Sequence, residues 1–428
     1  MKKNYKNLIS ISILILIMCG LVISLTTLTK STPLNTGNLT NIPSQNNTSN
    51  NNFTYIPPRT SLNQNILFEN NFGGSKTDEV FEVFNLGRYY TIGTTNSRDG
   101  YFSDNVNNSL IILILDYYGN TENVFTFSET TPIKIISTKI YKNSIYILIK
   151  STSFKLIEFN MSNNNFKTIY EATSDDADLI VSSEPIMVEQ NKTNTIFYFT
   201  VSNIKIESSL IVKQILLGTD YLNGTLLFFN TETNFIIATL SKSELNIITT
   251  YQNATLHSFN ITDKNFVVVL DTSLSYKIQL LDLKFNLIKE LTLNDSNQNF
   301  TLLYQNNTHH LFYVNNKSLN IISFCNHGDI IITKQLENNI LNYQALLLNN
   351  NFIVITEYIN HFQVSQLNTL AEQKNNIKIE LGSNFNIKYF DQTKNLNYAL
   401  IGNYNNKNKS ITNHFGDTDI FIMEITFN

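Results

Sequence analysis

Residues 71–104, NFGGSKTDEVFEVFNLGRYYTIGTTNSRDGYFSD, hold in one short unit the features that decide the fold. A Gly-Gly-Ser corner is followed by two runs of β-branched and aromatic residues, and an Asp-Gly loop comes after them. Runs of this composition, bounded by Gly, Asn and Asp, are typical of strands joined by tight turns. The stretch therefore predicts a small antiparallel sheet, and copies of that sheet along the chain would build the whole fold.

The second run of this unit has seven counterparts downstream. Their starts are separated by 55, 51, 30, 41, 44, 42 and 45 residues, and most of these intervals match the length of a four-stranded propeller blade. The interval of 30 residues does not. The eight runs are YYTIGTT (89–95), SIYILIK (144–150), TIFYFTV (195–201), TLLFFNT (225–231), FVVVLDT (266–272), HLFYVNN (310–316), FIVITEY (352–358) and NYALIGN (397–403).

These runs are apolar without a clean alternation between apolar and polar residues. A strand that is covered on both faces has this pattern, and the inner strands of a propeller blade lie between two neighbouring blades. No helical periodicity follows the first 29 residues. The sequence therefore predicts an all-β protein, a β-propeller of eight blades, with seven blades as the alternative.

A second motif repeats between the runs. LDYYGN (115–120) and LDLKFN (281–286) share a Leu-Asp-x-x-x-Asn frame. Asp and Asn hydrogen-bond to local backbone and tolerate tight geometry, so both segments are predicted to be turns between the third and fourth strands of a blade.

Two segments resemble the bacterial surface β-propeller repeats of the SBBP type. Residues 66–120 carry a Gly-Gly-Ser corner, a Gly-Thr-Thr strand end, an Asp-Gly loop and a Leu-Asp turn, and residues 402–428 carry Gly416, Asp419 and Phe421 in the order of that repeat. The resemblance covers about a fifth of the chain and implies a bacterial cell-surface propeller.

The ends of the predicted body complement each other. NILFEN (65–70) has the character of an outermost strand, and DIFIMEITF (419–427) that of a third strand without an outer partner. Pairing of the two would close the ring and remove two unpaired strand edges. A chain trimmed to begin at Phe72 is therefore predicted to be strongly destabilised.

The N-terminus predicts export. MKKNYK precedes an apolar segment from Leu8 to Leu25 that would span about 27 Å as a helix, close to the thickness of a bilayer. Residues 1–29 are thus predicted to be a transmembrane signal anchor with its lysines inside. The alternatives are a cleaved signal, which lacks a small-residue cleavage site, and a lipid anchor at Cys19, which Met18 disfavours.

The predicted domain order is an anchor, a stalk and a propeller. Residues 30–60 are rich in Asn, Thr, Ser and Pro and cannot bury enough apolar surface to fold, so they are predicted to be a disordered stalk. Residues 61–428 form the propeller. Because Cys19 lies in the apolar segment, Cys325 is alone in the body and no internal disulfide is expected.

Composition excludes several functions. The net charge is −4 and basic residues do not cluster after the N-terminus, so a nucleic-acid partner is not expected. The absence of Trp argues against WD repeats, quinone-dependent dehydrogenases and sialidases. The Arg residues are Arg59, Arg88 and Arg98, which is too few in the body for the arginine triad of a sialidase.

A candidate metal site lies in the Asp-Gly loop. Asp99, Asp104 and Asn105 offer oxygen ligands for calcium, although the spacing of a dedicated calcium loop is missing and a simple turn is the favoured interpretation. Calcium is the one cofactor that these residues suggest, and no catalytic residue is assigned. The acidic segment with Asp175, Asp176 and Asp178 is predicted to be a solvated loop between blades.

The remaining chemistry-bearing side chains favour structural roles. His309 and His310 are adjacent, so they are expected on opposite faces of a strand, where they cannot share a metal. Cys325 and His327 lie in SFCNHGD, which is better explained as a turn at a strand end than as a catalytic pair.

The function predicted from these features is that of a membrane-anchored, single-pass cell-surface protein whose propeller binds or adheres to an extracellular protein or glycan. A secreted or lipid-anchored form is the alternative location. The alternative functions are a hydrolase or lyase of a surface polymer and a structural envelope protein. The propeller function rests on analogy with other propellers, and the ligand and oligomeric state do not follow from the sequence.

Overall fold

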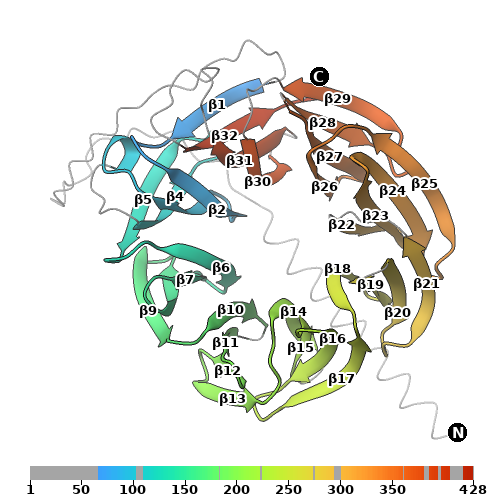
Figure 1. The fold of residues 1–428 in the computed structure, drawn as a ribbon. Coiled ribbons are helices and arrows are strands. Elements are labelled where there is room, and N and C mark those ends of the chain that lie inside the picture. The colour runs from blue at the N-terminus through green and yellow to red at the C-terminus, as the bar shows by residue number, and fades with distance from the viewer. Residues whose placement is uncertain are drawn as a thin grey trace, which may run out of the picture. The chain divides into compact units, whose positions relative to one another are not determined.

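The structure is a computed structural model that describes residues 66–102, 109–182, 184–221, 224–272, 275–293, 300–359, 361–379, 385–393, 397–404 and 418–427. These residues form one 3-10 helix, η1 (Gly100–Phe102), and strands β1 to β32. The strands make eight four-stranded antiparallel sheets around a central axis (Figure 1), so the prediction of an all-β, eight-bladed propeller is confirmed. Among the described residues, no helix has the length and apolar character needed to cross a membrane.

Each blade runs from an innermost strand at the central axis to an outermost strand at the rim. In this order, blade 1 contains β2 (Asp78–Asn85), β3 (Tyr89–Thr95), β4 (Ser109–Leu115) and β5 (Thr121–Ser128), and blade 2 contains β6 (Lys134–Tyr141), β7 (Ser144–Lys150), β8 (Phe154–Asn160) and β9 (Asn165–Ala172). Blade 3 contains β10 (Asp176–Val181), β11 (Pro185–Gln190), β12 (Thr195–Phe199) and β13 (Ile204–Ser208), and blade 4 contains β14 (Gln214–Tyr221), β15 (Gly224–Asn230), β16 (Asn234–Leu240) and β17 (Leu245–Gln252). Blade 5 contains β18 (Thr255–Ile261), β19 (Asn265–Asp271), β20 (Tyr276–Asp282) and β21 (Leu287–Leu293), and blade 6 contains β22 (Phe300–Gln305), β23 (Thr308–Asn315), β24 (Ser318–Cys325) and β25 (Ile330–Glu337). Blade 7 contains β26 (Asn342–Leu348), β27 (Asn351–Glu357), β28 (Phe362–Leu367) and β29 (Gln373–Ile379), and blade 8 contains β30 (Phe385–Gln392), β31 (Tyr398–Tyr404), β32 (Asp419–Ile425) and β1 (Ile66–Phe72).

The antiparallel order gives the propeller two distinct faces. In every blade the innermost strand begins at the same face at which the second strand ends and the third begins. We call this the upper face; it carries the loops between second and third strands and the connections from one blade to the next. The lower face carries the two hairpin turns of each blade.

Seven of the eight apolar runs are second strands, and one is not. The run at 195–201 is β12, the third strand of blade 3, and the second strand is β11, which begins at Pro185. Measured from second strand to second strand, the intervals around blade 3 are 41 and 39 residues, so the short interval of 30 disappears. The sequence of β11, PIMVEQ, has no aromatic residue and its apolar run is only three residues long, yet all its residues are buried.

Packing between blades explains the missing alternation. In β4 every residue is buried, because one face of the strand meets blade 8 and the other meets blade 2. Ile112 packs in one cluster with Ile147 of blade 2, whereas Leu113 packs in another with Ile422 of blade 8. Burying one such side chain contributes about 1.5 to 3 kcal/mol, so the apolar runs fasten the blades to one another.

The predicted turns lie between third and fourth strands, as expected. Asp116 accepts hydrogen bonds from the backbone N–H groups of Tyr118 and Asn120 at 2.8 Å, and Asp282 makes the equivalent bonds to Lys284 and Asn286. Two further turns have the same backbone hydrogen bonds without the Leu-Asp signature. They start at Cys325 and Asn368.

The two ends of the propeller share one sheet. β1 pairs with β32 in antiparallel register, with Asn70 opposite Ile422 and Phe72 opposite Ile420. The Gly-Gly corner follows directly, and a Cβ atom added to Gly73 would lie 2.1 Å from the Oδ1 atom of Asp419. Only glycine therefore allows the chain to turn this closely past β32 and into blade 1.

The predicted anchor at 1–29 and the predicted stalk at 30–60 lie outside the described residues, as does Gly416 of the SBBP-like segment. They remain predictions from the sequence.

Candidate functional site: two hollows on the upper face

Two hollows open between blades at the upper face. The blade 7–8 pocket has a volume of about 240 Å³ and the blade 3–4 cleft a volume of about 800 Å³. The pocket is lined by Asn342, Tyr343, Gln344, Ile355, Glu357, Phe362, Asn386 and Ile387. Because strand starts and strand ends meet there, side chains from two neighbouring blades converge on each hollow.

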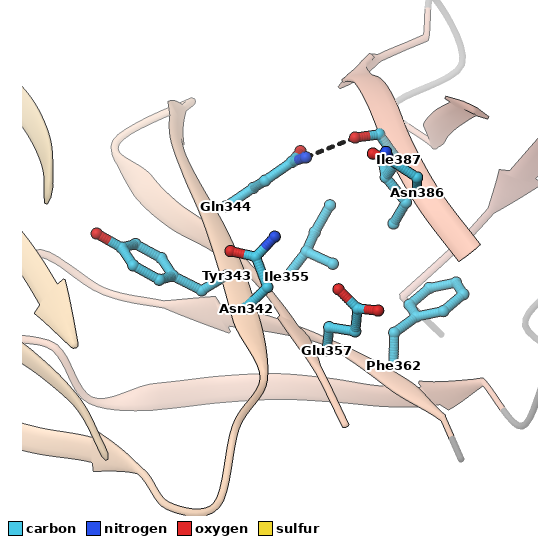
Figure 2. A pocket seen from close by; sticks show the side chains of 8 residues that line it. All are labelled: Asn342, Tyr343, Gln344, Ile355, Glu357, Phe362, Asn386 and Ile387. Atoms are coloured by element: carbon cyan, nitrogen blue, oxygen red, sulfur yellow. Dashed lines mark hydrogen bonds between the residues drawn. The ribbon is translucent and has the colours of Figure 1, made fainter. Parts of the chain in front are cut away.

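Strand ends position the polar groups of the blade 7–8 pocket (Figure 2). Glu357 ends β27, and its register partner Asn342 begins β26. Phe362 begins β28 beside them, and Asn386 lies near the start of β30 on blade 8. Gln344 spans the two blades, because its Nε2 atom donates a 2.6 Å hydrogen bond to the carbonyl oxygen of Ile387.

Glu357 is the charged group of the pocket lining. Its side chain is half-buried, and among the described residues it has neither a hydrogen-bond donor nor a cation as partner. Burial alone raises the pKa of the Glu357 carboxyl. The ion pairs among the described residues involve other carboxylates, those of Glu122, Glu129, Glu184 and Glu290.

Two other blades have an Asn at the place that Glu357 holds in blade 7. In blade 4, the amide of Asn230 at the end of the second strand bonds both backbone groups of Leu256 in the next blade, at 2.8 and 3.1 Å. In blade 8, Asn403 bonds both backbone groups of Val80 in the same way, at 2.6 and 3.0 Å. Each Asn thus pins one blade to the innermost strand of the next.

Glu357 holds the corresponding place in blade 7, opposite the start of the innermost strand. A carboxylate has no N–H to donate to the next blade, so the pair of hydrogen bonds that each Asn makes cannot form here. The carbonyl oxygen of Ile387 is satisfied instead by Gln344, from a different strand of blade 7. The pocket therefore lies where blade 7 has a carboxylate, without a partner among the described residues, in place of the Asn contact that blades 4 and 8 make.

This residue was missed in the sequence, although a signal for it exists. The runs TLLFFN (225–230), YALIGN (398–403) and FIVITE (352–357) align without gaps, and their last residues are Asn, Asn and Glu. Other strand ends vary as well, since FVVVLD (266–271) ends in Asp and SIYILIK (144–150) in Lys, so the difference becomes informative only with the contacts of Asn230 and Asn403 in view.

The blade 3–4 cleft is wider and more open. The start of β10, the loop after β11, the connection after β13 and the loop after β15 form its walls. Asp175, Asp176, Lys192, Lys213 and Glu232 are exposed there, so both signs of charge line the same surface. Such a surface suits a broad polar contact with a partner better than the enclosure of a small molecule.

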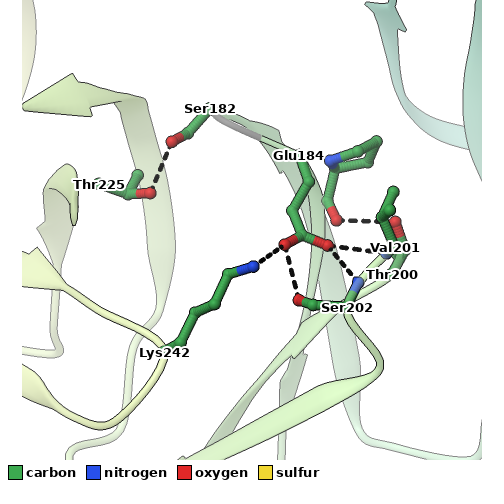
Figure 3. Close-up of polar contacts among 8 residues, drawn as sticks. Ser182, Glu184, Thr200, Val201, Ser202, Thr225 and Lys242 are labelled. Atoms are coloured by element: carbon green, nitrogen blue, oxygen red, sulfur yellow. Dashed lines mark hydrogen bonds and ion pairs between the residues drawn. The ribbon is translucent and has the colours of Figure 1, made fainter. Parts of the chain in front are cut away.

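A polar network joins the same two blades at the lower face (Figure 3). The Glu184 carboxylate accepts hydrogen bonds from the backbone of Val201 and Ser202 at 2.8 and 2.7 Å and pairs with Lys242 of blade 4 at 2.8 Å. Burial would raise the pKa of Glu184, but the bonds from Lys242 and Ser202 outweigh it and hold this pKa below its usual range. All its acceptor sites serve a turn and a neighbouring blade, so this network is structural.

The predicted calcium loop is only partly described. Asp104 and Asn105 lie outside the described residues, and Asp99 accepts a 2.6 Å hydrogen bond from the backbone N–H of Ser75. Asp99 thereby holds the Gly-Gly-Ser corner against the loop. No group of three or more His, Cys, Asp or Glu side chains in the described part of the chain is arranged to bind a metal.

The acidic segment at 174–178 is not wholly a loop. Asp175 precedes β10 and is exposed, but Asp178 lies inside this innermost strand. Burial raises the pKa of Asp178 to about 6, although Leu179 donates a backbone hydrogen bond to its Oδ1 atom at 2.7 Å. The prediction of a solvated loop is therefore wrong for Asp178.

We expect Asp178→Asn to stabilise the protein at neutral pH. A carboxyl whose pKa is higher in the folded than in the unfolded state costs stability once the pH exceeds both values. The gain at pH 7.5 should be about 1 to 2 kcal/mol in urea unfolding and should vanish near pH 4. An equal effect at both pH values would show that charge is not its cause.

The histidine and cysteine candidates have local partners. His309 bonds Asn326 at 3.1 Å and His310 bonds Ser323 at 2.8 Å, so the two rings engage different groups. Cys325 and His327 lie in the turn after β24, where the backbone N–H of His327 approaches the Cys325 Sγ at 3.4 Å. The interpretation of SFCNHGD as a turn is confirmed.

Comparisons with known proteins show the fold and no family. No protein-family model matches the sequence, and characterised proteins give no match. The structure is similar to the dihydro-heme d1 dehydrogenase NirN in complex with DHE (TM-score 0.53, 9% identity, 78% of this chain and 73% of that chain). It is also similar to Saccharomyces cerevisiae Sqt1 (TM-score 0.52, 11% identity, 84% and 99%).

A prolyl endopeptidase structure aligns with 78% of this chain at 9% identity and a TM-score of 0.47, and this chain spans about half of its length, 55%. At such identities the likenesses to NirN and Sqt1 establish the propeller fold alone.

Proposed function

We propose that this protein is a cell-surface binding or adhesion module that recognises an extracellular protein or glycan through the upper face of its propeller. The observation that carries the proposal is the pair of hollows on that face, one of which holds the unpaired carboxylate of Glu357. Unpaired polar groups in a concave site between rigid elements are what a binding site offers to a ligand.

The proposed setting follows from the sequence. Residues 1–29 would anchor the chain in the membrane, residues 30–60 would form a stalk, and the SBBP-like segments agree with a bacterial surface location. In this arrangement, pairing of β1 with β32 would close the ring and would transmit any pull on the stalk into a complete sheet. A propeller held in this way would present its loops to the outside of the cell.

A surface-polymer hydrolase has less support. Glycoside hydrolysis commonly needs two carboxyl groups about 5 to 9.5 Å apart, one as acid and one as base or nucleophile. Among the described residues that line the blade 7–8 pocket, Glu357 is the one carboxylate. The pocket so described provides recognition groups and lacks a pair for acid–base chemistry.

The proposal predicts ligand-dependent stabilisation. The full chain in mild detergent would be screened by thermal unfolding against calcium, a chelator, a glycan panel and a panel of peptides. A ligand present at 100 times its Kd should stabilise the native state by about 2.7 kcal/mol and raise the unfolding temperature by a few degrees.

Two further variants locate the effect. Lys213→Glu in the blade 3–4 cleft and Glu357→Gln in the blade 7–8 pocket should each reduce the response to a ligand of the upper face, whereas Lys167→Glu on the outermost strand β9 should not. A structural envelope protein without a ligand would respond to no member of the panels, and that result would overturn the proposal.

A further inference from the structure

We infer that the blade 7–8 pocket binds an ammonium group at the end of an aliphatic stem, namely a lysine side chain of a protein partner. This inference rests on the proposed binding function and names the ligand chemistry of one of its two hollows.

The pocket carries a negative charge that favours a cationic ligand. Glu357 carries a negative charge into a half-buried place where no described donor or cation compensates for it. A desolvated carboxylate gains most from a partner that is both charged and a hydrogen-bond donor. An ammonium group supplies one positive charge and three donors, so it completes what the pocket lacks.

The neighbouring amides point to the same ligand. Gln344 uses its Nε2 atom to bond Ile387, which leaves its amide oxygen as the acceptor end of the side chain. Asn386 is exposed at the rim and carries a further amide oxygen. Oxygen acceptors around one carboxylate suit the several N–H bonds of an ammonium group.

The size and the walls of the pocket suit the aliphatic stem of a lysine side chain. A volume of 240 Å³ corresponds to about eight water molecules, which is room for one side chain. Ile355 and Ile387 contribute aliphatic wall next to Glu357. Methylene groups would lie along this wall while the charged end reaches the carboxylate, in the manner of amphipathic lysine stems elsewhere.

An amino sugar is the rival source of an ammonium group, and the lining disfavours it. Phe362 is only 3% exposed and Tyr343 only 6%, so neither presents a ring face on which a sugar could stack. The Tyr343 hydroxyl is also engaged, since it donates to the carbonyl oxygen of Phe312 at 2.8 Å.

Comparison with blades 4 and 8 indicates that the pocket is more than a local defect in packing. The corresponding Asn230 and Asn403 each make two backbone bonds between blades, which a carboxylate at this place cannot make. Blade 7 lacks these two bonds to blade 8, and its carboxylate faces a cavity instead. A local departure of this kind from good packing is common at functional sites.

The test uses small probes on the full chain in mild detergent, followed by ligand-observed NMR. The probes are Nα-acetyl-lysine methylamide, its uncharged counterpart Nα-acetyl-norleucine methylamide, and glucosamine. We expect saturable binding of the lysine probe with a Kd in the millimolar range, as about 4 kcal/mol of binding energy gives. The norleucine probe should bind at least about tenfold more weakly, because it lacks the charge.

Variants assign the binding to the pocket. Glu357→Gln should weaken the lysine probe at least about tenfold without lowering the unfolding temperature, since it removes a half-buried charge. Glu357→Asn, which restores the residue type of blades 4 and 8, should do the same. Glu232→Gln in the blade 3–4 cleft is the matched control and should bind the probe as the unchanged chain does.

The outcomes separate the two proposals. Equal binding of the lysine and norleucine probes, equal binding by Glu357→Gln, no saturable binding of the lysine probe, or tighter binding of glucosamine would each overturn the lysine inference. A response to the glycan or peptide panels would leave the proposed function standing in all of these cases.

Discussion

Removal of β1 is expected to destabilise the propeller more than any single substitution proposed above. A chain that begins at Phe72 lacks nearly all of β1, so the backbone of β32 loses its outer partner along Asn70, Asn71 and their neighbours. All residues of β32 are buried in the intact sheet, and the loss of five of its six register pairs with β1, together with their cover, should cost about 5 kcal/mol or more. Thermal unfolding followed by far-ultraviolet circular dichroism measures this loss.

The matched control is a chain that begins at Ser61, which lacks the predicted anchor and stalk but keeps β1. It should unfold at the same temperature as the full chain. The shorter chain should also self-associate, because β32 presents an unpaired edge to solvent. An unchanged unfolding temperature for the chain that begins at Phe72 would show that the pairing of β1 with β32 does not stabilise the propeller.

The fold was predictable because its signals are local and repeated. Strands such as β4 and β7 have unbroken apolar interiors, since neighbouring blades cover both faces, and the interval between second strands fixes the blade length. The exception, β11, is buried along its whole length although PIMVEQ has only a short apolar run, Ile-Met-Val, between Pro and Glu-Gln. Tertiary context buries the polar end of this strand, and a single-sequence pattern cannot show it.

The candidate site was not predictable in the same way. Asp99 drew attention because an Asp-Gly loop resembles a cation loop, but its carboxylate accepts a hydrogen bond from the backbone N–H of Ser75 in the Gly-Gly-Ser corner. Glu357 went unnoticed because one Glu at the end of a strand is ordinary in composition. It becomes informative only when the structure shows that Asn230 and Asn403 pin adjacent blades from the same place. The candidate site lies in a departure from the repeat, which requires the three-dimensional register to be seen.

Acidification is the second large effect that we expect, and it arises from two adjacent histidines in β23. His309 is 0% and His310 3% exposed, and burial lowers the pKa of each to about 4. The bond from Asn326 opposes this shift for His309, whereas the neighbouring His309 adds to it for His310. The Nδ1 atom of His309 has no hydrogen-bond partner among the described residues, so a proton placed on it would be buried without a described acceptor.

The direction of the pH dependence follows from linkage. Between about pH 6.5 and pH 4 the unfolded chain binds protons that the folded chain excludes, so the stability contributed by neutral histidines is complete above pH 6.5 and falls as the pH decreases. Between pH 7.5 and pH 5 the loss should be about 2 kcal/mol for each ring, and about 3 to 4 kcal/mol for the coupled pair. Urea unfolding at several pH values measures it.

A double variant isolates the two rings from the other titrating groups. His309→Asn with His310→Asn loses the ring contacts with Phe324 and Phe352, so it should be less stable at every pH. Its stability should nevertheless fall by about 3 kcal/mol less than that of the unchanged chain between pH 7.5 and pH 5. Identical slopes in the two proteins would mean that these histidines are already charged in the fold. A steeper slope in the double variant would mean that the two rings bind protons more tightly in the folded than in the unfolded chain, because all other titrating groups are common to both proteins.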